Sequence, residues 1–260
     1  HVIDARWIMA YSAGLGETDA RYYDTAAPGG PLAHPLFPVC YEWPVSQPIR
    51  DLPAIVPHKA RLVHAQHDVL IHRMPRADET IRTTARIVAA LQRPPGAFVV
   101  YRFDAHSMSG EALTTTYFGV IYRGVELDGP SHTTEKLEEP PPTPPNLELL
   151  GRIQVGATAA HVYTECARIW NPIHTDIAYA KAAGLPGLIL HGTATLALSV
   201  SRLLRDFPGK VRRVRCRFAG MVLMPSTLTV HGARSPEAIG FETRNAQGEA
   251  VITRGQLLLE

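Results

Sequence analysis

The sequence of 260 residues is 45% hydrophobic and 19% charged, with a formal net charge of +2, which is the composition of a globular protein with one large core or two smaller ones. The near balance of charge gives no reason to expect nucleic acid or an anionic membrane surface as a partner. Because no apolar run reaches the length of a membrane span and no signal peptide opens the chain, we expect a cytoplasmic protein.

The first half is predicted to begin with a helix over residues 2–13, where apolar residues recur at helical spacing. Residues 17–60 are rich in proline, glycine and aromatic residues and show no sustained period. This segment therefore predicts either a packed functional loop or a set of short helical turns. Strands rich in Thr, Val, Tyr and Phe are then predicted over residues 61–72, 80–91, 97–105 and 111–122.

A proline-rich segment, residues 131–149, separates this half from the next. Its run Glu-Glu-Pro-Pro-Pro-Thr-Pro-Pro forms neither helix nor ladder and is typical of an extended linker. Further strands are predicted over residues 211–222, 227–233, 239–245 and 249–259. Each half thus has a helical or loop segment followed by about four antiparallel strands, which predicts an α+β fold of two similar units, residues 1–130 and 150–260.

The densest group of polar side chains lies between residues 163 and 204. In the run Asn171-Pro172-Ile173-His174, the proline fixes its own φ and keeps Asn171 out of the α region, so the histidine lies on a turn. Residues 193–207 carry apolar side chains at spacings of three and four, which predicts a buried helix. Gly192 lies at its start, where free backbone N–H groups favour negative charge. This combination suits a reaction that builds charge on an oxygen atom.

These residues resemble the MaoC-like dehydratases, the (R)-specific enoyl-CoA hydratase 2 group, in their fused double hot-dog form. The family pattern is Tyr, three residues, Ser-Gly-Asp, one residue and Asn-Pro-Leu/Ile-His. Tyr163 and the run from Asn171 to His174 match it at the right spacing, as do Asp176 and Gly192. The resemblance implies two curved antiparallel sheets, each wrapped around a long helix. It also implies a lyase whose substrate is an acyl-CoA or acyl-carrier thioester.

The motif residues acquire expected roles from this resemblance. His174 would transfer protons, Asn171 would hold the water or the substrate carbonyl, and the Gly192 N–H would stabilise the developing oxyanion. Asp176 is expected to orient the histidine. The residues expected to contact the substrate are Tyr163, Ile169, Trp170, His191 and Phe37. The first unit has no catalytic motif, and its apolar segment at residues 32–43 is expected to form a wall of the acyl pocket.

The chain departs from the family pattern at one position. Ala167-Arg168-Ile169 stands where the family has Ser-Gly-Asp, so Ile169 replaces the carboxylate that helps the histidine activate water. Glu165 is near in sequence, but the simpler interpretation is an exposed strand residue. We therefore expect a hydratase or dehydratase of an α,β-unsaturated or 3-hydroxyacyl thioester that uses His174 alone or with a substitute acid. The alternatives are an isomerase or atypical dehydratase on the same scaffold, and a non-catalytic acyl-thioester binder.

Other candidate sites have simpler interpretations. His64 and His67 are three residues apart on a predicted strand, so they are expected to face opposite ways and not to share a metal ion. Arg213, Arg215 and Arg217 are expected to share the solvated face of a strand, with the phosphates of a CoA-like carrier as the alternative contact. Three unpatterned cysteines fit reduced thiols. No dinucleotide fingerprint or phosphate loop is present, so we expect no cofactor. We expect a homodimer.

Overall fold

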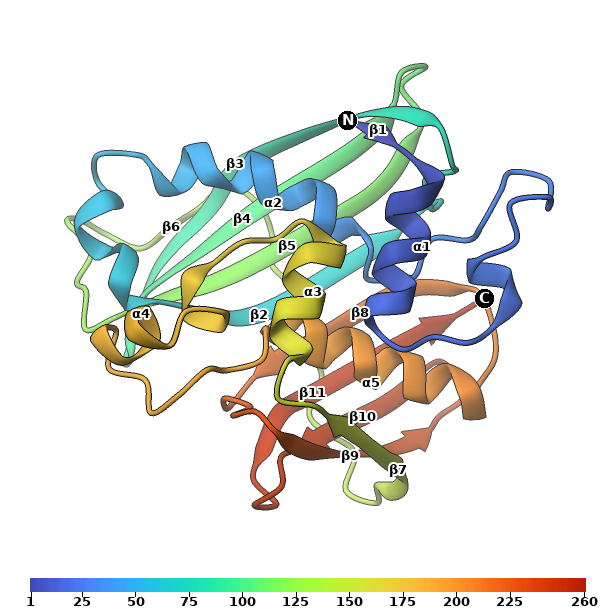
Figure 1. The fold of residues 1–260 in the computed structure, drawn as a ribbon. Helices are drawn as coiled ribbons and strands as arrows, with labels where there is room; N and C mark the ends of the chain where they lie inside the picture. Colours follow the sequence, from blue (N-terminus) through green and yellow to red (C-terminus); the bar gives the residue numbers. More distant parts are fainter.

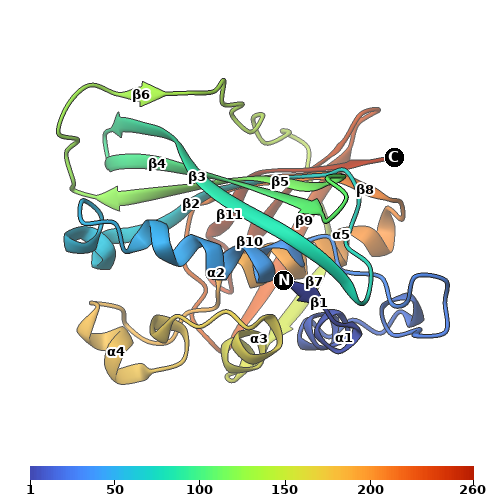
Figure 2. The ribbon, with the colours of Figure 1, turned by 90° about the horizontal axis from the view of Figure 1, so that it is seen from above.

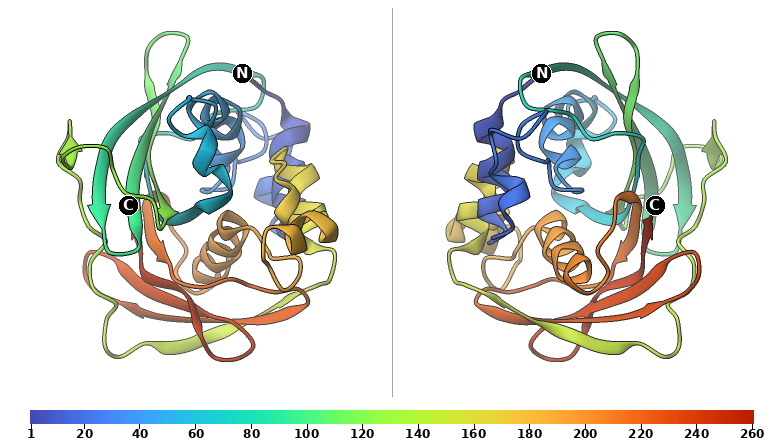
Figure 3. Two further views of the ribbon diagram at one scale, coloured as in Figure 1. Left: turned by 90° about the vertical axis from the view of Figure 1, so that its left-hand side faces the viewer. Right: turned by 90° about the vertical axis from the view of Figure 1, so that its right-hand side faces the viewer.

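The computed structural model describes residues 1–260 and contains one curved sheet of 11 strands (Figures 1 and 3). The order along the sheet is β1-β3-β4-β5-β2-β8-β11-β10-β9-β7, and β6 pairs with β3. The first unit supplies β1 (Val2–Ile3), β2 (Leu62–Ile71), β3 (Glu79–Arg93), β4 (Gly96–Ser107), β5 (Ala112–Arg123) and β6 (His132–Thr133). The second supplies β7 (Glu148–Val155), β8 (Val211–Phe218), β9 (Ser226–Arg234), β10 (Ile239–Arg244) and β11 (Ala250–Leu259).

The helices all lie on the concave side of this sheet (Figure 2). They are α1 (Ala5–Gly14), α2 (Pro38–Arg50), α3 (Ala159–Ala167), α4 (Ile177–Ala182) and α5 (Gly192–Asp206), with 3-10 turns at Ala20–Tyr22, Val56–Arg61 and Pro172–His174. In Figure 3, α2 and α5 lie inside the curve of the sheet, and α1 and α3 cover its open side. The expected α+β, double hot-dog fold is therefore confirmed. No helix is long and apolar enough to cross a membrane.

The two units share the sheet through one strand pair. β2 of the first unit runs antiparallel to β8 of the second, with Val69 opposite Val214. Both side chains are fully buried and belong to a single core of 39 residues drawn from both units. On the opposite face of the same strands, Arg213 donates from Nε and Nη2 to the two Asp68 oxygens at 2.8 and 2.7 Å. Apolar contact on one face and a bidentate ion pair on the other fix the register of this junction.

Helix α2 differs from what the sequence predicted for residues 17–60. The expectation was a loop or short turns, because Pro44 and Pro48 fall inside the segment; the structure has a helix of 13 residues. Each proline removes one backbone hydrogen bond from the helix, but packing against the rest of the protein holds the neighbouring turns in place. Tyr41 is fully buried, and its hydroxyl hydrogen-bonds to Thr114 at 3.0 Å. Burial of the apolar face of α2 against the sheet outweighs the lost helical hydrogen bonds.

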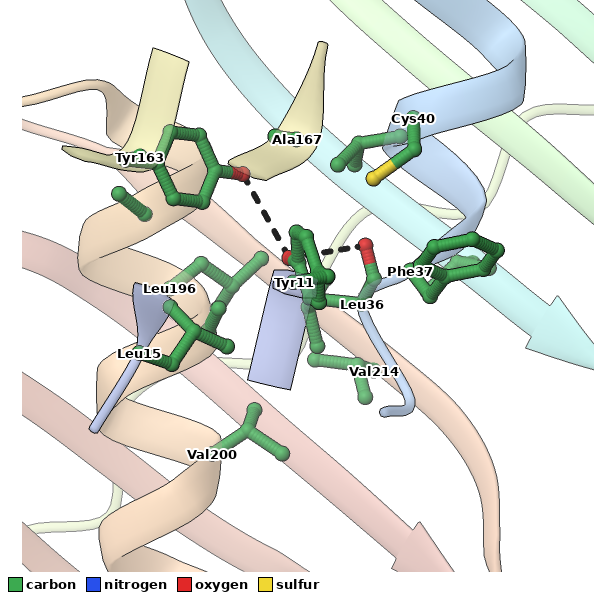
Figure 4. Close-up of a cluster of buried hydrophobic side chains, with 14 of the residues drawn as sticks. Tyr11, Leu15, Leu36, Phe37, Cys40, Tyr163, Ala167, Leu196, Val200 and Val214 are labelled. Atoms are coloured by element: carbon green, nitrogen blue, oxygen red, sulfur yellow. Dashed lines mark hydrogen bonds between the residues drawn. The ribbon is translucent and has the colours of Figure 1, made fainter. Parts of the chain in front are cut away.

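Helix α5 follows the prediction for residues 193–207 closely. Leu196, Val200 and Leu203 are all fully buried, so the expected apolar face is confirmed. Figure 4 shows this core from close by: the Tyr11 hydroxyl of α1 lies between Tyr163 of α3, at 3.5 Å, and the Leu36 carbonyl, to which it donates at 3.1 Å. These bonds tie the outer helices to the segment that leads into α2.

The proline-rich segment lies against the outer face of the sheet. Glu138 accepts from Arg213 at 2.9 Å and from Arg215 at 3.1 Å. Glu139 pairs with both Arg93 of β3 and Arg217 of β8. The arginines of β8 share one face, as predicted, but that face is covered by the acidic residues of this segment. Phosphate binding by Arg213 and Arg215 is therefore not supported.

The junction between the units gives a stability prediction. Asp68→Ala removes a carboxylate that is 3% exposed and leaves Arg213 partly buried, so the free energy of unfolding should fall by roughly 2–4 kcal/mol. The matched control is Asp51→Ala, whose pair with Lys59 is exposed and should contribute less than about 1 kcal/mol. Denaturant unfolding followed by circular dichroism measures both. Equal, small effects of the two variants would contradict the role of the junction.

Candidate active site

His174 lies on the 3-10 turn that Pro172 begins, as the sequence predicted. Its Nδ1 is 2.8 Å from the carbonyl oxygen of Ile189, which can only accept, so Nδ1 carries the proton. The lone pair of the ring is therefore on Nε2. Burial lowers the pKa of His174 to about 4, with the Ile189 carbonyl acting in the opposite direction. A neutral imidazole with a free Nε2 is a general base at neutral pH.

His191 stacks on His174, with ring centroids 3.6 Å apart and an interplanar angle of 25°. Its Nε2 is 3.3 Å from the Thr164 hydroxyl of α3, and its Nδ1 has no hydrogen-bond partner. Burial holds the pKa of His191 well below its usual value, and the neighbouring His174 lowers it further. An apolar environment disfavours a positive charge on either of the two stacked rings, so both imidazoles are neutral at neutral pH.

The start of α5 presents backbone donors beside these rings. The Gly192 N–H is in the first turn and has no intrahelical acceptor, and His191 at the N-cap position makes no side-chain cap. A methyl group on Gly192 would lie 3.2 Å from the Phe218 ring, so a glycine is favoured here by space. Tyr163 donates to the Thr193 hydroxyl at 3.1 Å and so supports this turn from behind. The donor geometry is suited to an oxyanion.

A cavity of about 920 Å³ lies against these groups. Asn171, Ile169, His174, His191 and Gly192 line it from the second unit. The first unit contributes α2 and the inner faces of β2, β4 and β5, through Val39, Glu42, Trp43, His64, Tyr101, Phe103 and Phe118. The cavity is mostly apolar and is formed by both units, which is typical of a site for a small-molecule ligand with an apolar portion.

Four predicted site residues lie elsewhere. Trp170 is 65% exposed and does not line the cavity, because the turn before Pro172 directs it to solvent. Phe37 is fully buried in the core, 5.2 Å from Trp7 in an edge-to-face contact, and Tyr163 is buried behind the wall. Asp176 accepts from the backbone N–H groups of Ala178 and Tyr179 as the N-cap of α4, so it does not orient His174.

Ile169 lines the cavity and is 5% exposed. The residue before it, Arg168, ends α3 in the left-handed conformation at φ 58°, at the position where the family pattern has Gly. Its guanidinium lies 4.3 Å from the centre of the Trp7 ring and pairs with Asp4, which offsets part of the backbone strain. The main chain thus adopts the left-handed conformation where the family pattern has Gly, and the Ile169 side chain that follows lines the cavity and is apolar.

Sequence reasoning was wrong about two histidines and missed one acid. A bulge between His64 and Gln66 turns both His64 and His67 to the inner face, with ring centroids 5.5 Å apart. No group of three His, Cys, Asp or Glu side chains is placed to hold a metal ion. Glu42 lines the cavity from α2. Its sequence signal was a single charge inside the apolar run from Leu36 to Trp43.

Comparisons with known proteins agree with this fold. The model of the MaoC like domain matches residues 140–255, and the model of the FAS1-like, dehydratase domain region matches residues 1–116. A MaoC-like dehydratase from Phytophthora Capsici superposes with a TM-score of 0.82 at 19% identity, over 100% of this chain and 93% of that chain. At this identity the likeness concerns the fold.

Two curated relatives extend over most of the chain. Peroxisomal multifunctional enzyme type 2 of Mus musculus is 26% identical over 215 residues, which is 79% of this chain but only 28% of the mouse protein. Enoyl-CoA hydratase ChsH3 of Mycobacterium tuberculosis is 26% identical over 216 residues, covering 80% of this chain and 73% of that protein. The chain is thus a double hot-dog protein with a cavity between its units that His174 and His191 line. Within that class, residues 140–255 match the MaoC like domain, and residues 1–116 match the FAS1-like dehydratase domain region.

The buried imidazoles predict acid sensitivity. Burial lowers the pKa of His174 and His67 to about 4, from 6.5. Because their folded pKa values are depressed, the stability they contribute is complete above pH 6.5 and is lost as pH falls towards 4, by about 2 kcal/mol each at pH 5. Glu42 has a raised pKa and acts in the opposite direction. His67→Leu should therefore flatten the decrease in unfolding free energy between pH 7 and about 5, and exposed His72→Gln should not. Equal slopes in all three proteins would contradict this.

The replaced family residue gives a second test. Ile169→Asp places a charge in an apolar wall, so turnover of crotonyl-CoA should stay unchanged or fall, and stability should fall by roughly 1–3 kcal/mol. Ile169→Asn has the same shape without the charge and separates the two effects. A clear gain in hydration rate in the aspartate variant would show that the site lacks only this carboxylate.

Proposed function

We propose that this chain is a hydro-lyase that adds water to an α,β-unsaturated acyl thioester, or removes it from a 3-hydroxyacyl thioester. The observation that carries the proposal is that the free Nε2 of His174 and the Gly192 N–H lie on the wall of the same cavity. The relative ChsH3 is an enoyl-CoA hydratase, and its likeness to this chain supports the same reaction class here.

The chemistry follows from the two groups. In dehydration, Nε2 of His174 takes the proton from Cα while the thioester oxygen gains negative charge. The Gly192 N–H stabilises that oxygen, a contribution of about 3 kcal/mol for one such donor. The side-chain amide of Asn171 makes no hydrogen bond within the protein and lines the cavity, so it is available to the 3-hydroxyl group or to the attacking water. Hydration is the same sequence in reverse.

The first unit is proposed to shape the acyl pocket, with residues 1–130 and 150–260 as the two units. Aromatic side chains of its sheet line the inner part of the cavity. Five arginines and one acid line the same cavity; Arg93 and Arg217 are paired with Glu139, whereas Arg50, Arg61 and Arg123 are in no ion pair. This surplus of positive charge supports a substrate whose carrier, CoA or the phosphopantetheine of a carrier protein, brings phosphate. A homodimer and a cytoplasmic location stay predictions.

One alternative has an observation in its favour. Ile169 occupies the place of the family carboxylate, and a double-bond isomerase needs only one mobile proton and no activated water. Such an enzyme would exchange the Cα proton with solvent deuterium without net hydration. A non-catalytic binder would do neither, and a free histidine base beside an N–H donor argues against it.

The central test is His174→Ala. If this imidazole transfers the proton, kcat for hydration of crotonyl-CoA should fall by about 10²–10⁴-fold, with KM changed little. The control His132→Ala removes an exposed histidine of β6 and should behave as wild type. Spectrophotometric loss of the enoyl thioester and solvent-deuterium exchange at Cα are measured side by side. A His174→Ala enzyme within about threefold of wild type would refute the proposed role.

A further inference from the structure

The only acidic residue on the cavity wall is Glu42, in the middle of α2. It is 3% exposed. Its Oε1 accepts a hydrogen bond of 2.5 Å from the Thr116 hydroxyl of β5, and its Oε2 has no hydrogen-bond partner. No salt bridge includes it, although five arginines line the same cavity. A buried carboxyl with an open oxygen is unusual, because most buried polar groups are satisfied within the protein.

The position of α2 gives this carboxyl access to the site. Helices α2 and α5 both lie inside the curve of the sheet (Figure 3). Val39, one turn before Glu42, belongs to the same core cluster as Leu190 and Ala194, which flank the His191–Gly192 turn. Val39 and Thr195 of α5 both line the cavity with Glu42. A carboxyl of the first unit and the imidazole of the second therefore border one volume.

The environment sets the two groups in complementary protonation states. Burial raises the pKa of Glu42 to about 8, and the Thr116 hydroxyl only partly offsets this. The same physical cause lowers the pKa of His174 to about 4. At neutral pH the cavity therefore holds a protonated carboxylic acid and an unprotonated base, which is the pair that a proton-transfer reaction needs.

We propose that Glu42 is the second catalytic residue of this site, an acid supplied by the first unit in place of the family carboxylate that Ile169 replaces. This inference rests on the proposed hydro-lyase function. It names the substitute acid that the motif itself lacks and gives the first unit a chemical role besides shaping the pocket.

The proton transfers balance as follows. In dehydration, the Cα–H bond breaks and its proton goes to Nε2 of His174, while the electron pair forms the Cα–Cβ double bond. The Cβ–O bond breaks, and Glu42 gives its proton to the leaving hydroxyl, which departs as water. The site is then an imidazolium and a carboxylate, and a proton passes back from one to the other through solvent before the next cycle. Hydration runs the same steps in reverse, after the proton of Glu42 has passed to His174 through solvent.

Among the buried titratable groups around Glu42, the neighbours have pKa values shifted away from neutral pH. Cys40 and Tyr41, on the same helix, feel its charge, and burial raises the pKa of both groups well above their usual values, so they stay protonated. From the sheet, burial keeps the pKa of His64 well below its usual value. A fall in kcat as pH rises through about 8 is therefore assigned to ionisation of Glu42.

The experiment compares Glu42→Gln with wild type and with Glu165→Gln. The glutamine keeps the size of the side chain and can accept from Thr116, but it cannot give a proton. Glu165 is exposed on α3 outside the cavity. Rates of crotonyl-CoA hydration and of 3-hydroxybutyryl-CoA dehydration are measured from pH 6 to about 9.5, with thermal stability alongside. The expected result is a kcat lowered by about 100-fold or more in Glu42→Gln, similar KM, no alkaline decrease, and a wild-type profile for Glu165→Gln.

The outcomes separate the two proposals. A folded Glu42→Gln enzyme with kcat within about threefold of wild type overturns the role of Glu42 and leaves the hydro-lyase function standing. If that variant does not fold, the wild-type profile decides: an alkaline decrease near pH 8 supports the inference, and a flat profile overturns it. A wild-type protein inactive on both thioesters, under conditions where it is folded, overturns the proposed function and this inference with it.

Discussion

The site depends on the pairing of β2 with β8. This single antiparallel contact turns two curved sheets into one and places α2 and α5 inside the same curve. The buried contact of Val69 with Val214 and the ion pair of Asp68 with Arg213 hold its register. A slip of one residue would turn the inner side chains of a whole strand outward. The cavity between the units exists only because that register is fixed.

The low polarity of the cavity then shifts the pKa values of the groups that border it. Removing water disfavours whichever form is charged, so it strips the proton from an imidazole and keeps the proton on a carboxyl. His174 and Glu42 are thus affected in opposite directions by the same cause. The apolar wall that includes Ile169 contributes to this effect, where a fixed aspartate charge would weaken it. The loss of the family carboxylate is consistent with an acid that works in its protonated form.

The sequence predicted those parts of the structure in which local pattern and tertiary packing agree. The apolar spacing in α5, the antiparallel strands of both units and the turn at His174 were all confirmed. Helix α2 was missed because its prolines oppose helix formation locally, and only the burial of Tyr41 and its neighbours overrides them. The bulge that turns His64 inward depends on its partner strand, and no local pattern signals it. Trp170 was misplaced because apolar character does not say which side of a turn is solvent.

The acidic segment before β7 has a consequence for how the site is assembled. Glu139 reaches Arg93 on a strand of the first unit and Arg217 on a strand of the second, so the connection is fastened across both. When a pocket is formed by two separate subunits, the fraction of complete pockets depends on the concentration of the subunits. Here the two units belong to one chain, and the connecting segment holds them at an effective concentration that is typically on the order of millimolar. Formation of the pocket is therefore a first-order event, and dilution of the protein leaves each pocket complete.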